Sequence, residues 1–108
     1  MTVKEFADQF HYTVLALPDE NRTIKGGYAG DLLSWVMGKL IPDQAWVTIM
    51  SNINIVAVAT LADPSCIILS EQVIPDDEVI AKAKQQGINL LSSAKDTFSV
   101  CLDIAKAL

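Results

Sequence analysis

The sequence has 108 residues, of which 51% are hydrophobic and 19% are charged, and a formal net charge of −5 at pH 7. This length allows one hydrophobic core but no second one, so we expect a single domain over residues 1–108. A net negative charge repels phosphate backbones, which argues against DNA or RNA as a partner. No apolar run reaches the roughly 18 to 20 residues of a membrane span, and Met1 to Glu5 lack the pattern of a secretory signal. We therefore expect a cytoplasmic protein with no membrane partner.

The hydrophobic content is itself informative. At 51% it exceeds the usual range of about 45 to 50%, although a small domain has proportionally more surface to cover with polar groups. The composition predicts that some apolar surface is left for a partner subunit.

The first element is a helix with a recognisable start. Thr2 and Glu5 have the spacing of a capping box, in which each side chain accepts a hydrogen bond from the other residue's backbone amide, and predict a helix to about Phe10. Tyr12 to Leu17 is a short apolar run that ends in turn residues, which predicts a buried strand. Arg22 to Lys25 is expected to be a brief extended segment.

A glycine-rich segment precedes the second helix. Its glycines, which loosen the backbone, are Gly26, Gly27 and Gly30. Asp31 then caps the helix or lies in its first turn, and the helix ends near residues 38 to 40. Trp35 projects from the polar side of this helix, opposite the apolar stripe, which makes it a candidate interface residue.

The rest of the chain alternates between strands and helices. The expected elements are a strand at 45–50, a helix from about 52 to 61, a strand at 66–69, a helix at 75–86 with Gly87 at its end, a strand at 88–91, and a helix capped at Ser93 with an apolar stripe of Phe98, Cys101, Leu102 and Ala105. The β-branched residues at 55–58 would equally fit a continued strand. This alternation predicts a three-layer α/β domain with a mostly parallel sheet of about four to five strands between helices.

In such sheets, ligands bind beyond the carboxyl ends of the strands. This rule selects two loops, Pro18 to Gly30 and Ser51 to Asn54. In the second loop, Ser51, Asn52 and Asn54 could form hydrogen bonds with a small neutral or nucleotide ligand, although helix capping explains them equally well.

The glycine segment could hold an anion at the start of the following helix. It lacks the Gly-Lys-Ser/Thr ending of a P-loop, and Asp31 places a negative charge where a phosphate would lie. Glycines required by a tight turn, with Asp31 as a cap, are the alternative. The acidic run Asp76 to Glu78 is expected to be the solvated first turn of a helix.

Residues for metal binding or nucleophilic catalysis are scarce. His11 is the only histidine, and neither cysteine is near it in the sequence, so we expect no metal site and no cofactor. Cys66 and Cys101 lie in apolar runs and are expected to be core thiols. Nothing in the sequence orients His11 for a Ser-His-Asp arrangement, so we expect no enzyme activity.

The segment from Asn21 to Met37, which includes Asn-Arg-Thr and Gly-Gly, resembles the DRTGG domain family. The resemblance continues through residues 45–59 and 75–91 and so covers nearly the whole chain. It implies an α/β domain similar to the amino-terminal domain of HPr kinase. Family members occur beside CBS domains in regulated pyrophosphatases, before phosphotransacetylase domains, and in gene clusters of iron hydrogenases. The resemblance therefore implies a regulatory or dimerising module.

Six residues match the pattern of this family and become ligand-binding candidates together with Ser51 and Asn52: Arg22, Thr23, Gly26, Gly27, Asp31 and Asn54. Two positions depart from it, because Asn21 stands where the family has aspartate and Asn52 where many relatives have histidine. A binding property that depends on those groups would be altered here.

Three hypotheses remain. The first is a regulatory homodimer that senses a small ligand, with adenine nucleotides as candidates. The second is an interaction subunit that binds a larger enzyme and no small molecule. The third is a phosphotransfer enzyme, against which the missing P-loop lysine counts.

Overall fold

Local sequence signals set the boundaries of most elements in the computed structural model, which describes all of residues 1–108. Thr2 and Glu5 form the predicted capping box, with bonds of 2.8 and 3.1 Å. The elements in chain order are α1 (Val3–Phe10), β1 (Thr13–Ala16), β2 (Gly26–Ala29), α2 (Leu33–Lys39), β3 (Gln44–Thr48), α3 (Asn54–Ala62), β4 (Cys66–Leu69), α4 (Asp77–Gln85), β5 (Leu90–Ser92) and α5 (Thr97–Ala107). None of these helices combines the length and the apolar character that a membrane span requires.

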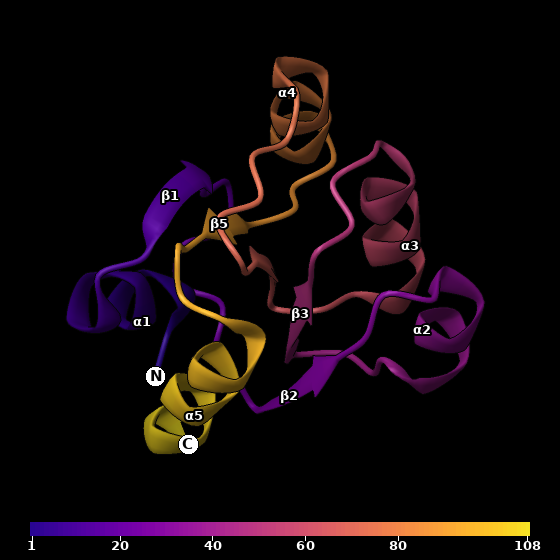
Figure 1. Cartoon of the computed structure of the whole chain (residues 1–108). Coiled ribbons are helices and arrows are strands. Elements are labelled where there is room, and N and C mark those ends of the chain that lie inside the picture. Colours follow the sequence, from indigo (N-terminus) through magenta and orange to yellow (C-terminus); the bar gives the residue numbers. More distant parts are fainter.

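The five strands form one sheet in the order β1-β5-β4-β3-β2 (Figure 1). Strands β2 to β5 are parallel to one another, and β1 is antiparallel to β5. The predicted mostly parallel α/β sheet is confirmed. We call the edge at which β2 to β5 end the carboxyl edge, and the edge at which they begin the amino edge. Because β1 runs the other way, it ends at the amino edge.

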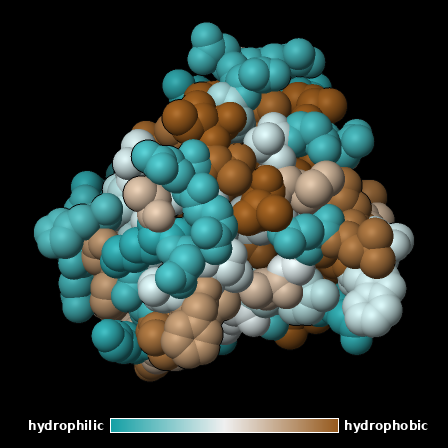
Figure 2. Space-filling view, viewed as in Figure 1, coloured by the Kyte–Doolittle hydropathy of each residue, from teal (hydrophilic) through white to brown (hydrophobic).

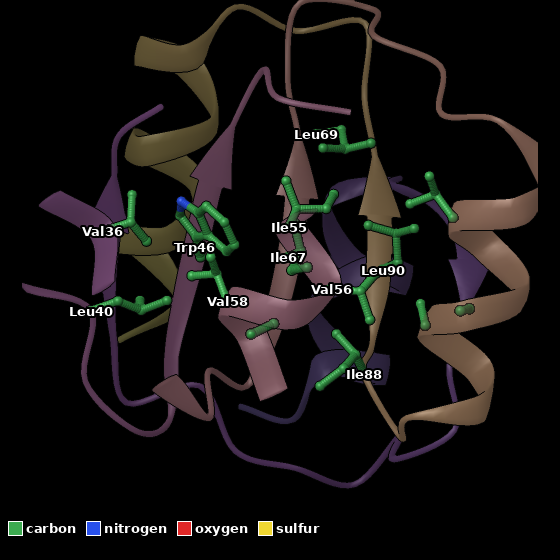
Figure 3. Close-up of a cluster of buried hydrophobic side chains, with 14 residues drawn as sticks. Val36, Leu40, Trp46, Ile55, Val56, Val58, Ile67, Leu69, Ile88 and Leu90 are labelled. Carbon is green, nitrogen blue, oxygen red and sulfur yellow. The ribbon is translucent and has the colours of Figure 1, made fainter. Parts of the chain in front are cut away.

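Helices α2, α3 and α4 cover one face of the sheet. Trp46, Ile67 and Leu90 point from the strands into this layer, where they meet Val36 and Ile55 from the helices (Figure 3). The Trp46 side chain has no exposed surface, and its Nε1 donates to the Gly30 carbonyl at 3.0 Å. This bond satisfies the indole in an apolar layer, where an unpaired N–H would be costly.

Helices α1 and α5 cover the opposite face. Phe6 of α1 is fully buried, with its ring centre 4.9 Å from that of Tyr12 and 5.1 Å from that of Phe10. From α5, Val100 and Ile104 pack into the same cluster. Both faces of the central strands are therefore buried, which explains why β4 is a continuous apolar run without alternation.

The glycine segment differs from the prediction. Gly26–Ala29 is the edge strand β2 and not a loop before a helix, whereas Arg22 to Lys25 contribute only an isolated bridge between Thr23 and Thr2. A glycine suits position 27 because α5 approaches the strand closely there. A Cβ atom on Gly27 would lie 3.1 Å from Ile104 Cγ2.

The helices after β3 agree only in part with the predictions. The helix after Asn52 is confirmed as α3, which ends at Asp63 in a left-handed conformation. The cap of α5 is Asp96, whose side chain accepts a bond from the Ser99 amide at 2.7 Å, and not Ser93. The predicted apolar stripe of α5 is also wrong, because its buried residues are Val100, Asp103 and Ile104.

Candidate functional site

Arg22, a predicted ligand-binding residue, is held at the amino edge by two carboxylates. Its Nε donates to Asp43 Oδ1 at 3.0 Å and its Nη1 donates to Asp63 Oδ1 at 2.7 Å, while Nη2 donates to the Asp63 carbonyl at 2.7 Å. The bond to Asp63 and then the bond to Asp43 raise the pKa of Arg22. Asp43 precedes β3 and Asp63 follows α3, so the guanidinium joins three segments of the chain. Its donors are engaged in structural contacts.

Asn89 forms further hydrogen bonds at the amino edge. Its side chain is 2% exposed, donates to the carbonyls of Asp19 and Ser65 at 2.7 and 3.0 Å, and accepts from the Asp19 amide at 2.9 Å. The sequence offered no signal for this role, because residue 89 lies inside a predicted buried strand. Together, Arg22 and Asn89 tie the loop after β1 to the strands beside it.

The predicted site residues are divided between the two edges of the sheet. Arg22, Thr23 and the start of β2 at Gly26 lie at the amino edge, because β1 is antiparallel and delivers the chain there. Residues 51–54 follow β3 and lie at the carboxyl edge. The expectation that the two loops meet at one edge is therefore corrected. The ligand-binding role of each residue stays a prediction.

Asp31 lies at the carboxyl edge but does not cap α2, whose N-cap residue is Leu32. Its Oδ1 accepts bonds from the Thr48 hydroxyl at 2.8 Å and from the Ile49 amide at 2.9 Å. Asp31 therefore ties the loop after β2 to the end of β3, while its carboxylate remains exposed and negative.

The Ser51 to Asn54 loop begins α3. Asn52 Oδ1 accepts a bond from the Asn54 amide at 2.9 Å, which is an Asx turn, and the N-cap residue Ile53 provides no side-chain bond. This geometry supports the capping explanation for Asn52. The Asn54 side chain faces the groove described next.

An open groove of about 410 Å³ lies between α3 and α4. Its walls combine apolar side chains with amide, hydroxyl and ammonium groups, and the residues are Ile53, Asn54, Val56, Ala57, Thr60, Leu61, Lys82 and Gln86. Lys82 forms no ion pair. The groove therefore offers apolar contact beside an unneutralised positive charge.

A second, smaller groove of about 240 Å³ lies between α5 and the edge strand β2. It is almost wholly apolar and is lined by Gly27, Tyr28, Ala29, Val47, Cys101, Ile104, Ala105 and Leu108. The outer side of β2 pairs with no strand, so unpaired backbone donors and acceptors lie next to this groove. Apolar surface beside an open strand edge is suited to contact with another protein chain.

Trp35 lies on the exposed side of α2, as the sequence predicted. Its indole is 61% exposed, and the Lys39 ammonium lies 5.5 Å from the ring centre. A cation–π contact at an exposed site contributes about 0.5 to 1 kcal/mol. A role for Trp35 in an interface stays a prediction.

The most perturbed titratable groups are structural. Tyr12 donates to Asp103 Oδ2 at 2.9 Å, and the Lys95 ammonium is 2.6 Å from the same oxygen. Burial, followed by the bond to Asp103, raises the pKa of Tyr12 well above its usual value. Burial also raises the pKa of the Cys66 thiol to about 12, which leaves it protonated and unreactive. The sequence missed the Asp103 cluster because an aspartate is not expected on a buried helix face.

No three histidine, cysteine, aspartate or glutamate side chains lie together in a geometry that could hold a metal ion. His11 is exposed at the junction between α1 and β1, in a left-handed conformation.

The family model of the DRTGG domain matches residues 29–107, well over half of the chain. The chain belongs to the DRTGG domain family. The matched segment begins at Ala29, so the Asn21 to Gly27 motif lies outside it. Family membership of this DRTGG domain therefore does not rest on Arg22, Thr23, Gly26 or Gly27. No curated protein sequence matches it significantly.

A solved structure has a similar fold. It comprises the CBS and DRTGG domains of the regulatory region of Clostridium perfringens pyrophosphatase, complexed with its activator diadenosine tetraphosphate. The TM-score is 0.77 over 99% of this chain, with 15% sequence identity. The DRTGG domain described here corresponds to 47% of that chain, or about half its length. At this identity, the similarity shows a shared fold.

Proposed function

We propose that this DRTGG domain is a non-catalytic regulatory module that binds a small ligand, with an adenine nucleotide as the first candidate. The observation that carries the proposal is the groove between α3 and α4, where an unpaired lysine lies beside apolar side chains. The activator of the similar pyrophosphatase region is a dinucleotide, which supports nucleotides as the ligand class.

The groove has the chemical groups that a nucleotide requires. Ala57 and Leu61 offer apolar surface against which a base can pack, and the amides of Asn54 and Gln86 can donate to and accept from its edge. Lys82 can bind a phosphate as a point charge. Arg22 lies at the amino edge, where Asp43 and Asp63 engage its guanidinium, and it does not line this groove.

Thermal unfolding with AMP, ADP, ATP and diadenosine tetraphosphate tests this proposal. A ligand at about 100 times its dissociation constant adds about 2.7 kcal/mol to the free energy of unfolding, which is a rise in Tm of about 10 °C or more. The rise should disappear in Lys82→Ala and persist in Lys84→Ala, a matched exposed lysine on the same helix that does not line the groove. A flat panel, or equal loss in both variants, contradicts the proposal.

The perturbed groups support a non-catalytic role. A catalytic acid, base or nucleophile needs a shifted pKa at an accessible site. Here the Tyr12 hydroxyl is bonded to Asp103, and the Cys66 thiol is buried between the sheet and helices α1 and α5. Incubation with ATP should therefore give no product. Turnover that Asp31→Asn abolishes would favour the phosphotransfer alternative.

We also infer that the domain forms a homodimer through β2 and α5. The groove beside β2 is apolar, and the Leu102 and Leu108 side chains of the same region are 45% and 66% exposed. Two copies related by a twofold axis could pair their β2 edges and pack α5 against α5, which would bury this surface in both.

Sedimentation at micromolar concentration tests the dimer. Ala105→Glu places a charge in the groove and should give a monomer. Ala81→Glu makes the same change at an exposed site on α4, far from β2, and should stay dimeric. Loss of the dimer in Trp35→Ala instead would assign the interface to α2. A monomer at all concentrations contradicts both versions.

A further inference from the structure

The carboxyl edge carries a concentration of exposed apolar side chains, of which only Ile53 belongs to a groove used by the proposed functions. Five large apolar residues lie in the loops that follow β2, β3 and β4 or in the first turn of α5. They are Leu32, Ile49, Ile53, Ile74 and Phe98, with exposed fractions of 62%, 44%, 36%, 83% and 73%. We call this set the apolar rim. Figure 2 shows a broad hydrophobic area across the middle of one face, with hydrophilic side chains above it and to its left.

The same loops are strongly acidic. The segments between each parallel strand and its following helix contain four carboxylates, at Asp31, Glu71, Asp76 and Asp96. Their only cation is Lys95, whose ammonium lies 2.6 Å from Asp103 Oδ2 and is neutralised there. None of the four carboxylates forms an ion pair. The apolar rim is therefore bordered by unneutralised negative charge.

Hydrogen bonds hold these loops in place. Glu71 accepts a bond from the Thr97 amide at 2.9 Å, and the Ser70 and Thr97 hydroxyls are 2.7 Å apart. Glu71 and Gln72 both adopt left-handed conformations, with φ of 60° and 64°, which are unfavourable for residues with a Cβ and persist only where the surroundings enforce them. A preformed surface loses little conformational entropy when a partner binds.

We propose that the apolar rim docks a basic amphipathic segment of another protein, whose apolar side chains cover Ile74 and Phe98 and whose lysine or arginine side chains meet the surrounding carboxylates. Charge complementarity selects this partner. A second copy of the domain would place like carboxylates opposite one another across a twofold axis. The proposal goes beyond ligand binding and the dimer, because the rim lies outside the α5–β2 groove and shares only Ile53 with the groove between α3 and α4.

Binding of a synthetic amphipathic helix of about 18 residues, composed of leucine and lysine, tests the proposal. Fluorescence anisotropy of the labelled peptide should show saturable binding to the full chain, and the affinity should fall as the salt concentration rises. Phe98→Ser and Ile74→Ser should each weaken binding about tenfold while leaving Tm unchanged. Ile41→Ser is the matched control, since Ile41 is 57% exposed, lies before β3 at the amino edge and lines neither groove, and it should bind like the unmodified protein.

A second peptide with glutamate in place of lysine tests the charge argument. It should not bind, and Asp76→Lys should weaken binding of the lysine peptide, because Asp76 forms no side-chain bond whose loss would disturb the fold. The proposal is overturned if neither peptide binds, if both bind equally, or if Ile41→Ser weakens binding as much as Phe98→Ser. The adenine nucleotide panel reports on the α3–α4 groove, so failure of one proposal is distinguishable from failure of the other.

Discussion

The amino and carboxyl edges of the sheet both carry charged and polar loops, but their side chains make different contacts. At the amino edge, Arg22 and Asn89 form several hydrogen bonds each to neighbouring segments. At the carboxyl edge, carboxylates such as Asp31 and Asp76 form no ion pair and lie among exposed apolar side chains. From residue type alone, either edge could have been taken as the binding site. The contacts show that the polar side chains of the amino edge stabilise the fold, whereas those of the carboxyl edge are available to bind a partner.

The reason for the difference lies in the connections. Helices α2, α3 and α4 link the parallel strands and pack on the sheet, whereas the segment between β1 and β2 contains no helix. Backbone bonds to Val3, Lys4 and Asp43 hold that segment. The side chains of Arg22 and Asn89 add further bonds to it.

The largest expected effect is loss of the Asn89 bonds. Asn89→Ala removes three hydrogen bonds and leaves the carbonyls of Asp19 and Ser65 without this donor, so the free energy of unfolding should fall by about 2 to 4 kcal/mol. Urea unfolding measures this change. Asn54→Ala, at an exposed asparagine of the carboxyl edge, should change stability by less than about 0.5 kcal/mol. Equal losses in the two variants would erase the distinction between the edges.

Arg22→Gln should have the next largest effect. The Arg22 side chain is 20% exposed but Asp63 is 59% exposed, so solvent screening places the loss at about 1 to 2 kcal/mol, between those of surface and buried pairs. Lys25→Gln is the control, because Lys25 is 68% exposed and 3.7 Å from Asp43, and it should be nearly neutral. If Arg22→Gln abolished the nucleotide-induced rise in Tm without lowering stability, Arg22 would be assigned a role in ligand binding.

A substitution at Gly27 tests how closely α5 packs against strand β2. Gly27→Ala should destabilise the domain by about 1 kcal/mol, because the new Cβ would lie 3.1 Å from Ile104 Cγ2. Gly38→Ala in α2 meets no atom within 4 Å and should stabilise it by about 0.5 to 1 kcal/mol through helix propensity. Thermal unfolding should give shifts of opposite sign, and a common sign would contradict the packing of α5.

The smallest expected effect is a loss of stability at acidic pH, to which one helix cap near each edge should contribute. Backbone bonds from Thr2 and Ser99 lower the pKa of Glu5 and Asp96 below their usual values of 4.5 and 3.8. Carboxylates with a lowered pKa stabilise the folded state above the unfolded pKa, and the contribution is lost as pH falls through the folded pKa. The Tm of the double variant, which carries both Glu5→Gln and Asp96→Asn, should therefore depend less on pH below 4.5 than that of the unmodified protein. Parallel Tm curves would show that these caps do not contribute.

The sequence predicted the elements that have strong local signals. The capping box of α1, the apolar run of β4 and the helical reading of α3 are all confirmed. Strand β2 was not predicted because Gly26 and Gly27 weaken β propensity. The role of Gly27 depends on its contact with Ile104 of α5, which is distant in the sequence.

The candidate site was less predictable, because residue patterns do not show the direction of a strand. The antiparallel pairing of β1 moved Arg22 and Thr23 to the amino edge, away from Ser51 and Asn54. The face of α5 was misassigned for a related reason. Asp103 looked like a solvent-facing residue, and only tertiary contacts with Tyr12 and Lys95 make its burial favourable.

Backbone amide chemical shifts, followed by NMR during titration with the leucine–lysine peptide, test the central claim most directly. The difference between the edges predicts that the amides of residues 31–32, 49–53, 71–76 and 95–98 shift, while those of residues 22–25 and of Asn89 stay unchanged. Shifts concentrated around Arg22 and Asp43 would contradict the claim and assign binding to the amino edge.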